Sequence, residues 1–182
     1  MQNASAIRQL CQAAAILGVL CVTTIATAGI KSERQLAAII TQTPAPQIVA
    51  EGSQMKVADQ AASAIAGAQT FWGIGESMQP LYAPNTAIVV RPIAYKDIKK
   101  GMTLVYTKRN GHVVAHSVVG EDAQGYVVQG VNNDQADRES VNERNLIGVV
   151  VAAYAATDSE LRIELARTLV SKGRLTREAA RI

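Results

Sequence analysis

The apolar residues of this chain follow three patterns, and each is typical of a different kind of structure. Residues 10–29 are almost all apolar or small, and none of them is charged. Short apolar runs separated by turn residues follow between residues 86 and 151, and runs of that length predict β-strands. Beyond residue 156, leucines recur at helical spacing among charged residues. We therefore expect a mainly β protein with an N-terminal apolar helix and a C-terminal amphipathic helix.

These patterns divide the chain into regions with different expected roles. Segment 41–54 contains two prolines and favours a linker, whereas segment 57–66 is alanine-rich and helix-prone. About 150 residues beyond the apolar run are enough for one domain with its own core. The expected regions are a membrane anchor or signal peptide at 1–30, a helix-prone, proline-containing linker at 31–70, a β domain at 71–156, and a basic helical tail at 157–182.

The first region has two interpretations. Arg8, the apolar run and the small residues of Ala26-Thr27-Ala28 together have the form of a secretory signal peptide. The run is also long enough to span a bilayer as an uncleaved helix. In both cases the rest of the chain is expected outside the cytoplasm, in a single-pass membrane protein or, after cleavage, a secreted or periplasmic one. Cys11 and Cys21 lie in or beside this run, so the rest of the chain has no cysteine for a disulfide.

Charge and composition narrow the range of partners. The net charge is +3 at neutral pH, and no aromatic residues are interleaved with the basic residues of the tail, which argues against nucleic acid as a partner. A solvated amphipathic helix accounts for that tail, with contact to anionic lipid as the alternative. The sequence has no glycine-rich phosphate loop and no paired-cysteine motif, so we expect neither a cofactor nor a metal site. His112 follows a turn glycine and is interpreted as a surface residue.

Two segments carry the candidate chemistry. Gly75-Glu76-Ser77-Met78-Gln79-Pro80 places a hydroxyl between a glycine and a proline, which favours an exposed turn. Val113–Gly120 places His116 in an apolar run typical of a strand. A serine hydroxyl is a weak nucleophile until a neighbouring base accepts its proton, and imidazole is suited to that role near neutral pH. Ser77 and His116 are therefore candidates for a nucleophile and its base; the alternative is a structural turn serine and a structural strand histidine.

The order of these segments resembles the signal peptidase I superfamily of serine peptidases. Its pattern is Ser-Met-x-Pro, then Gly-Asp and a strand, then a strand that bears the base, then Gly-Asp-Asn-x-x-x-Asp. Here the corresponding segments are Ser77–Pro80, Gly101–Tyr106, the His116 strand and Gly130–Asp137. Bacterial members and self-cleaving repressors carry a lysine base, whereas the endoplasmic-reticulum and archaeal type carries histidine, as this chain does. The resemblance extends from about residue 73 to residue 151.

The resemblance implies a signal-peptidase/repressor-type β fold, mostly antiparallel, with residues 71–156 as the catalytic domain of a serine endopeptidase without metal or cofactor. Its substrates would be peptides or proteins that are exported or membrane-associated, such as signal-peptide-bearing precursors. Ser77 would be the nucleophile, His116 the general base and Asp137 the residue that orients the imidazole. Asp134 competes for the third role, with a turn residue as its structural alternative. Backbone amides near Ser77 would stabilise the oxyanion, because Gly75 stands where bacterial members have a hydroxyl.

Departures from the superfamily pattern keep other hypotheses open. Val131 and Met102 stand where the superfamily has aspartates, Ser117 where arginine usually follows the histidine, and Asn85 where glycine is common. A non-catalytic relative that uses the same scaffold as a peptide-binding or structural module is therefore the alternative function. A lysine base is the alternative chemistry, because a desolvated amine can serve a serine nucleophile. The lysines between Ser77 and His116 are Lys96, Lys99, Lys100 and Lys108.

Overall fold

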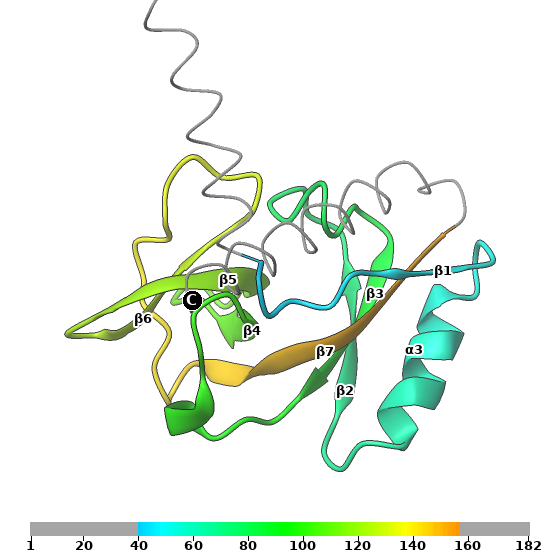
Figure 1. Ribbon diagram of the computed structural model, residues 1–182, viewed down its shortest axis with the longest axis horizontal. Helices are drawn as coiled ribbons and strands as arrows, with labels where there is room; N and C mark the ends of the chain where they lie inside the picture. Colours follow the sequence, from blue (N-terminus) through cyan, green and yellow to red (C-terminus); the bar gives the residue numbers. More distant parts are fainter. Residues whose placement is uncertain (1–39, 157–182) are drawn as a thin grey trace, which may run out of the picture. The chain divides into compact units, whose positions relative to one another are not determined.

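The computed structural model describes residues 40–156, which form a seven-stranded sheet with one α-helix, α3, packed on it (Figure 1). The strand order is β2-β3-β7-β4-β5-β6, and β1 pairs separately with β7. All pairs are antiparallel except the parallel pair of β1 and β7. The predicted mainly β architecture is thus confirmed. The elements are β1 (Gln47–Val49), α3 (Gln54–Ser63), β2 (Gln69–Gly73), β3 (Thr86–Arg91), the 3-10 turn η1 (Tyr95–Asp97), β4 (Thr103–Thr107), β5 (Val113–Asp122), β6 (Gly125–Gln129) and β7 (Leu146–Ala156).

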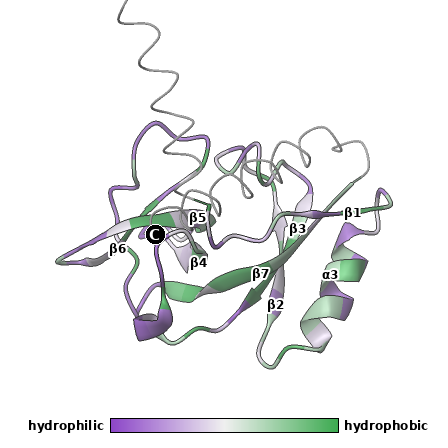
Figure 2. Cartoon of the chain, in the orientation of Figure 1, coloured by the Kyte–Doolittle hydropathy of each residue, from purple (hydrophilic) through white to green (hydrophobic). Residues whose placement is uncertain are grey.

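Strand β7 holds the sheet together, because it pairs with β3 and β4 along its two edges and with β1 near its end. It is hydrophobic over much of its length (Figure 2), as expected for a central strand that is covered on both faces. The ladders to β3 and β4 each contain a register shift. A Cβ at Gly148 would lie 2.3 Å from the carbonyl oxygen of Arg91, so the close approach of β3 to β7 requires glycine there.

The core lies on both faces of this sheet. On one face Ala58 and Ala62 of α3 pack against Val89 of β3 and Tyr154 of β7. The helix has ten residues, too few to be stable alone in water, so its apolar face against the sheet stabilises it. A second buried cluster joins the segment after Ser77 to the sheet; its members are Ile40, Met78, Leu81, Tyr82, Ile88, Val90, Val105, Val131, Val150 and Ala153.

Segment 41–54 is packed structure rather than the linker favoured by the sequence, whereas the helix-prone segment 57–66 largely coincides with α3. Ile40 is fully buried, β1 extends the sheet, and the hydroxyl of Thr43 donates to the carbonyl of Gly101 at 2.9 Å. The same hydroxyl lies 2.8 Å from that of Thr103, which is 3.0 Å from the hydroxyl of Ser117. This buried chain of hydroxyl groups ties the segment to β4 and β5. The folded unit therefore includes residues upstream of the expected boundary at residue 71. The sequence pattern did not predict β1 because prolines are unusual in strands and are confined mostly to sheet edges.

The predicted apolar segment at 1–30 and the predicted tail helix at 157–182 lie outside the described residues. Among residues 40–156, no helix has the length and apolar character needed to cross a membrane.

Candidate active site

Ser77 lies in the turn between β2 and β3, where its side chain is half-buried. The turn is anchored by the buried side chain of Met78 and by a 2.9 Å bond from the Tyr82 N–H to the Met78 carbonyl. The carbonyl of Ser77 accepts a 2.7 Å bond from the N–H of Asn132. Beside that bond a Cβ at Gly130 would lie 2.7 Å from the Ser77 carbonyl oxygen. The glycine thus lets the loop after β6 lie directly against the serine turn.

His116 and Asp137 approach Ser77 from two other parts of the fold. His116 sits in β5, opposite Leu104 of β4, and only 3% of it is exposed. Asp137 lies in the loop between β6 and β7, and its N–H donates to the carbonyl of Val128 at 2.8 Å. Its side chain is 5% exposed. The fold therefore brings the three residues selected from the sequence into one place.

The three side chains form a continuous hydrogen-bonded chain. Nε2 of His116 is 2.9 Å from Oγ of Ser77, and Nδ1 of His116 is 3.0 Å from Oδ1 of Asp137. A carboxylate can only accept, so Nδ1 carries a proton and donates it to Asp137. In the neutral ring Nε2 is then free to accept the proton of the Ser77 hydroxyl. This is the arrangement needed for a serine nucleophile, its base and a residue that orients the base.

Two further residues hold Asp137, and neither was predicted in this role from the sequence. The hydroxyl of Tyr106, in β4, donates to Oδ2 of Asp137. The ammonium of Lys108, just after β4, lies 2.7 Å from the same oxygen. The available signal was the alternation along β4, which puts Tyr106 on the same face as Leu104, the partner of His116. This alternation could point to Tyr106 only once the pairing register of β4 and β5 was known.

These contacts change the ionisation of the two acidic groups. Burial raises the pKa of Asp137, but the hydrogen bonds from His116, Lys108 and Tyr106 outweigh it and hold the pKa well below its ordinary value. Burial, reinforced by the bond to Asp137, raises the pKa of Tyr106 far above its ordinary value. At neutral pH Asp137 is therefore a carboxylate and Tyr106 a neutral donor.

The competing candidates occupy other places. Asp134 is exposed and lines the same shallow hollow of about 730 Å³ as Asp137, but among the described residues only Asp137 contacts His116. Lys96, Lys99 and Lys100 are exposed, and among the described residues Lys108 pairs with Asp137 rather than with Ser77. His112 is exposed, as expected, but it also lines the groove beside Ser77. Within residues 40–156, no three His, Cys, Asp or Glu side chains are grouped as metal ligands.

An apolar groove of about 550 Å³ runs beside the serine, between the end of β2 and the start of β5. Trp72, Ile74 and Val113 are exposed around it, with Ile74 81% exposed. Its floor and walls include Phe71, Met78, Ile88, Val105 and Ala115.

The residues that depart from the superfamily pattern have structural roles here. Val131 is 4% exposed in the core cluster of Met78, and Ser117 is fully buried in the hydroxyl chain described above. Met102 packs beside a third core cluster, whose buried members include Leu104, Tyr106 and Val118. Asn85 has a φ of 68°, a conformation that glycine adopts freely and that asparagine tolerates better than other residues. None of these substitutions alters the three-residue chain.

No protein-family model matches this chain, and no curated protein matches it. The assignment of a function therefore depends on the residues and geometry of the site.

Proposed function

We propose that this protein is a serine endopeptidase of the signal-peptidase type, which cleaves peptide bonds of exported or membrane-associated proteins. The observation that carries the proposal is the hydrogen-bonded chain from Ser77 through His116 to Asp137. The three residues come from a turn, a strand and a distant loop, and they meet beside an apolar groove. The antiparallel sheet and the order of the segments agree with the signal-peptidase/repressor-type fold that the sequence resembles.

The chemistry would proceed through an acyl-enzyme. Oγ of Ser77 attacks the carbonyl carbon of the scissile bond while its proton passes to Nε2 of His116. The tetrahedral intermediate collapses, the C–N bond breaks, and the proton on Nε2 passes to the departing amine. Water then attacks the ester carbonyl and gives a proton to Nε2, which returns it to Oγ as the acid product leaves. Asp137 stabilises the imidazolium in both halves.

Backbone amides are available for the oxyanion. The N–H groups of Ser77 and Met78 donate to no backbone carbonyl of residues 40–156. Gly75, two residues before the serine, is exposed and has open space around it. Donors aimed at the developing negative charge often contribute most to catalysis. We assign this role to the backbone beside Ser77, where a carbonyl oxygen of a bound peptide would come to lie.

The groove is suited to an extended peptide with apolar side chains. Within the described residues β2 is an edge strand, and Val113–His116 of β5 pair only with β4, because β6 begins its pairing at Ser117. Two unpaired strand edges therefore flank the groove, and a peptide can bind such edges by adding a strand. The apolar lining favours side chains without charge. Residues 1–30, as anchor or signal peptide, would bring the enzyme to membrane-associated substrates or outside the cytoplasm.

Labelling of the purified full-length chain with a fluorophosphonate tests this proposal. The probe forms a bond from phosphorus to Oγ of an activated serine and releases fluoride, so it needs no knowledge of the substrate. We expect wild type to be modified at Ser77, and Ser77→Ala and His116→Ala to remain unmodified. Circular dichroism of the three proteins checks that each is folded. Folded wild type that reacts no faster than Ser77→Ala would overturn the peptidase proposal and favour the non-catalytic module.

A further inference from the structure

Lys108 is placed to act on the site without touching Ser77 or His116. It follows β4, and its ammonium lies 2.7 Å from Oδ2 of Asp137, the oxygen that does not face His116. Its side chain is 28% exposed, whereas that of Asp137 is 5% exposed. The ion pair therefore joins a nearly buried carboxylate to a cation at the protein surface, a setting in which charges interact more strongly than in open water.

The two oxygens of Asp137 have separate partners. Oδ1 faces Nδ1 of His116, while Oδ2 receives the hydroxyl of Tyr106 and the ammonium of Lys108. Two donors on Oδ2 restrict rotation of the carboxylate and keep Oδ1 directed at the imidazole. Of these donors only Lys108 carries a charge. Its ammonium offsets part of the negative charge that His116 experiences from Asp137.

That balance matters because the base must be neutral before it accepts the serine proton. A carboxylate beside an imidazole favours the protonated ring, and a cation on the same carboxylate opposes this effect. Three other charged residues line a hollow together with Lys108 and Asp137: Asp134, Arg138 and Glu139. Glu139 adds negative charge close to Tyr106 and accepts a 2.9 Å bond from the N–H of Arg109. Lys108 is thus the cation in direct contact with a cluster that otherwise contains two carboxylates, a tyrosine and a histidine.

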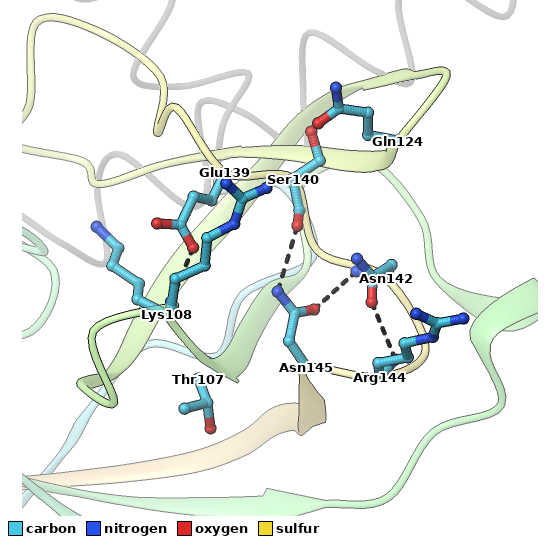
Figure 3. Close-up of a pocket in the computed structure, with 9 residues that line it drawn as sticks. Thr107, Lys108, Gln124, Glu139, Ser140, Asn142, Arg144 and Asn145 are labelled. Atoms are coloured by element: carbon cyan, nitrogen blue, oxygen red, sulfur yellow. Dashed lines mark hydrogen bonds between the residues drawn. The ribbon is translucent and has the colours of Figure 1, made fainter.

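We propose that Lys108 is a positioning residue for the serine–histidine–aspartate chain, holding Asp137 in register with His116 and offsetting the charge of its carboxylate. This inference rests on the proposed peptidase function. Lys108 also borders a polar hollow of about 350 Å³, and its side chain extends away from Asn142, Asn145 and Arg144 on the opposite wall (Figure 3). The hollow leaves the lysine reachable from solvent, so its replacement requires no repacking of the core.

The test is the pH profile of fluorophosphonate labelling of the full-length chain. Lys108→Met keeps much of the side-chain length and removes the charge. We expect its plateau rate to fall by about tenfold, as for the loss of a charged hydrogen bond. We expect its acidic limb to move to higher pH by about half a unit to one unit, because the unbalanced carboxylate favours the protonated imidazole. Lys108→Arg should restore both, and Lys96→Met, which changes an exposed lysine, should match wild type.

A second measurement does not depend on reactivity. The chain has two histidines, so imidazole NMR signals of wild type and Lys108→Met can be assigned with the aid of His112→Gln. The titration midpoint of the His116 signal should rise in Lys108→Met and stay in place in Lys96→Met. If wild type is labelled at Ser77 and Lys108→Met shows the same pH profile and the same titration midpoint, the role of Lys108 is overturned while the peptidase proposal stays intact. Absence of labelling in wild type would overturn both.

Discussion

The hydroxyl of Tyr106 donates a hydrogen bond to Oδ2 of Asp137, so the aspartate that orients His116 is itself held from the neighbouring strand β4. Tyr106 is fully buried, and its ring lies edge-on to that of His116, with 6.3 Å between the ring centres. One residue therefore supports the imidazole by packing and the carboxylate by hydrogen bonding. The two functions can be separated by removing the hydroxyl alone.

We expect Tyr106→Phe to fold and to react more slowly with the fluorophosphonate. The change leaves the ring in place but removes one donor from Asp137, which should cost about 1–3 kcal/mol of stability. The labelling rate should fall severalfold because the carboxylate is less firmly held. Tyr95→Phe is the matched control, since the Tyr95 hydroxyl donates to the Val141 carbonyl at 3.1 Å, away from Ser77. Equal labelling rates in the two variants would show that the Tyr106 hydroxyl does not act on the site.

The choice between the two loop aspartates can be tested by matched amide substitutions. Asp137→Asn keeps the shape but cannot stabilise an imidazolium and presents a donor or a neutral acceptor to Nδ1. In serine–histidine–aspartate sites this change lowers turnover by about 10⁴, so we expect labelling at Ser77 to fall by several orders of magnitude. Asp134→Asn changes an exposed side chain and should label at the wild-type rate. A reversed result would assign the third role to Asp134.

Local sequence patterns could predict much of the sheet but only part of the site. The apolar runs Thr86–Val90 and Thr103–Tyr106 predict two strands, and the observed β3 and β4 each extend one residue further. Strand β1 was missed because it has three residues beside prolines, and its partner β7 lies far along the chain. Its pairing is a property of the tertiary fold and has no local signal.

The same limit applies to the residues around Asp137. Ser77 and His116 stand in recognisable sequence contexts, and the resemblance selected Asp137 from its loop. Tyr106 and Lys108 meet that aspartate only because the β4–β5 register sets Leu104 opposite His116. Their roles depend on contacts between distant segments, which neither composition nor spacing reveals.

The pH dependence of folding should report the ionised state of Asp137. Its pKa is lower in the folded chain than in the unfolded one, where it is about 3.9. The unfolded state therefore takes up a proton first as pH falls. The stability due to this group, on the order of 2 kcal/mol, is fully present above about pH 5 and is lost progressively as pH falls towards the lower pKa of the folded chain.

Urea unfolding of wild type and Asp137→Asn from pH 7 to pH 3 isolates this contribution. The pKa of Asp122 is also lowered, chiefly by the hydrogen bond from Ser140, so wild type alone would report more than one group. We expect the difference between the two proteins to be largest at neutral pH and to shrink steadily below pH 5. A difference that is constant over this range would mean that Asp137 gains nothing from its partners on folding.

The packing of residues 40–43 against the sheet can be tested at Gly101. This glycine has a φ of 86°, and a Cβ there would lie 2.2 Å from the Thr41 hydroxyl oxygen and 3.2 Å from the Thr41 nitrogen. Gly101→Ala should therefore combine backbone strain with a clash and cost more than about 3 kcal/mol. Gly111→Ala is the control, because its φ of 83° is similar but a Cβ meets nothing within 4 Å. Strain alone should cost Gly111→Ala about 1 kcal/mol, so similar urea midpoints for the two variants would mean that residues 40–43 do not pack against the turn at Gly101.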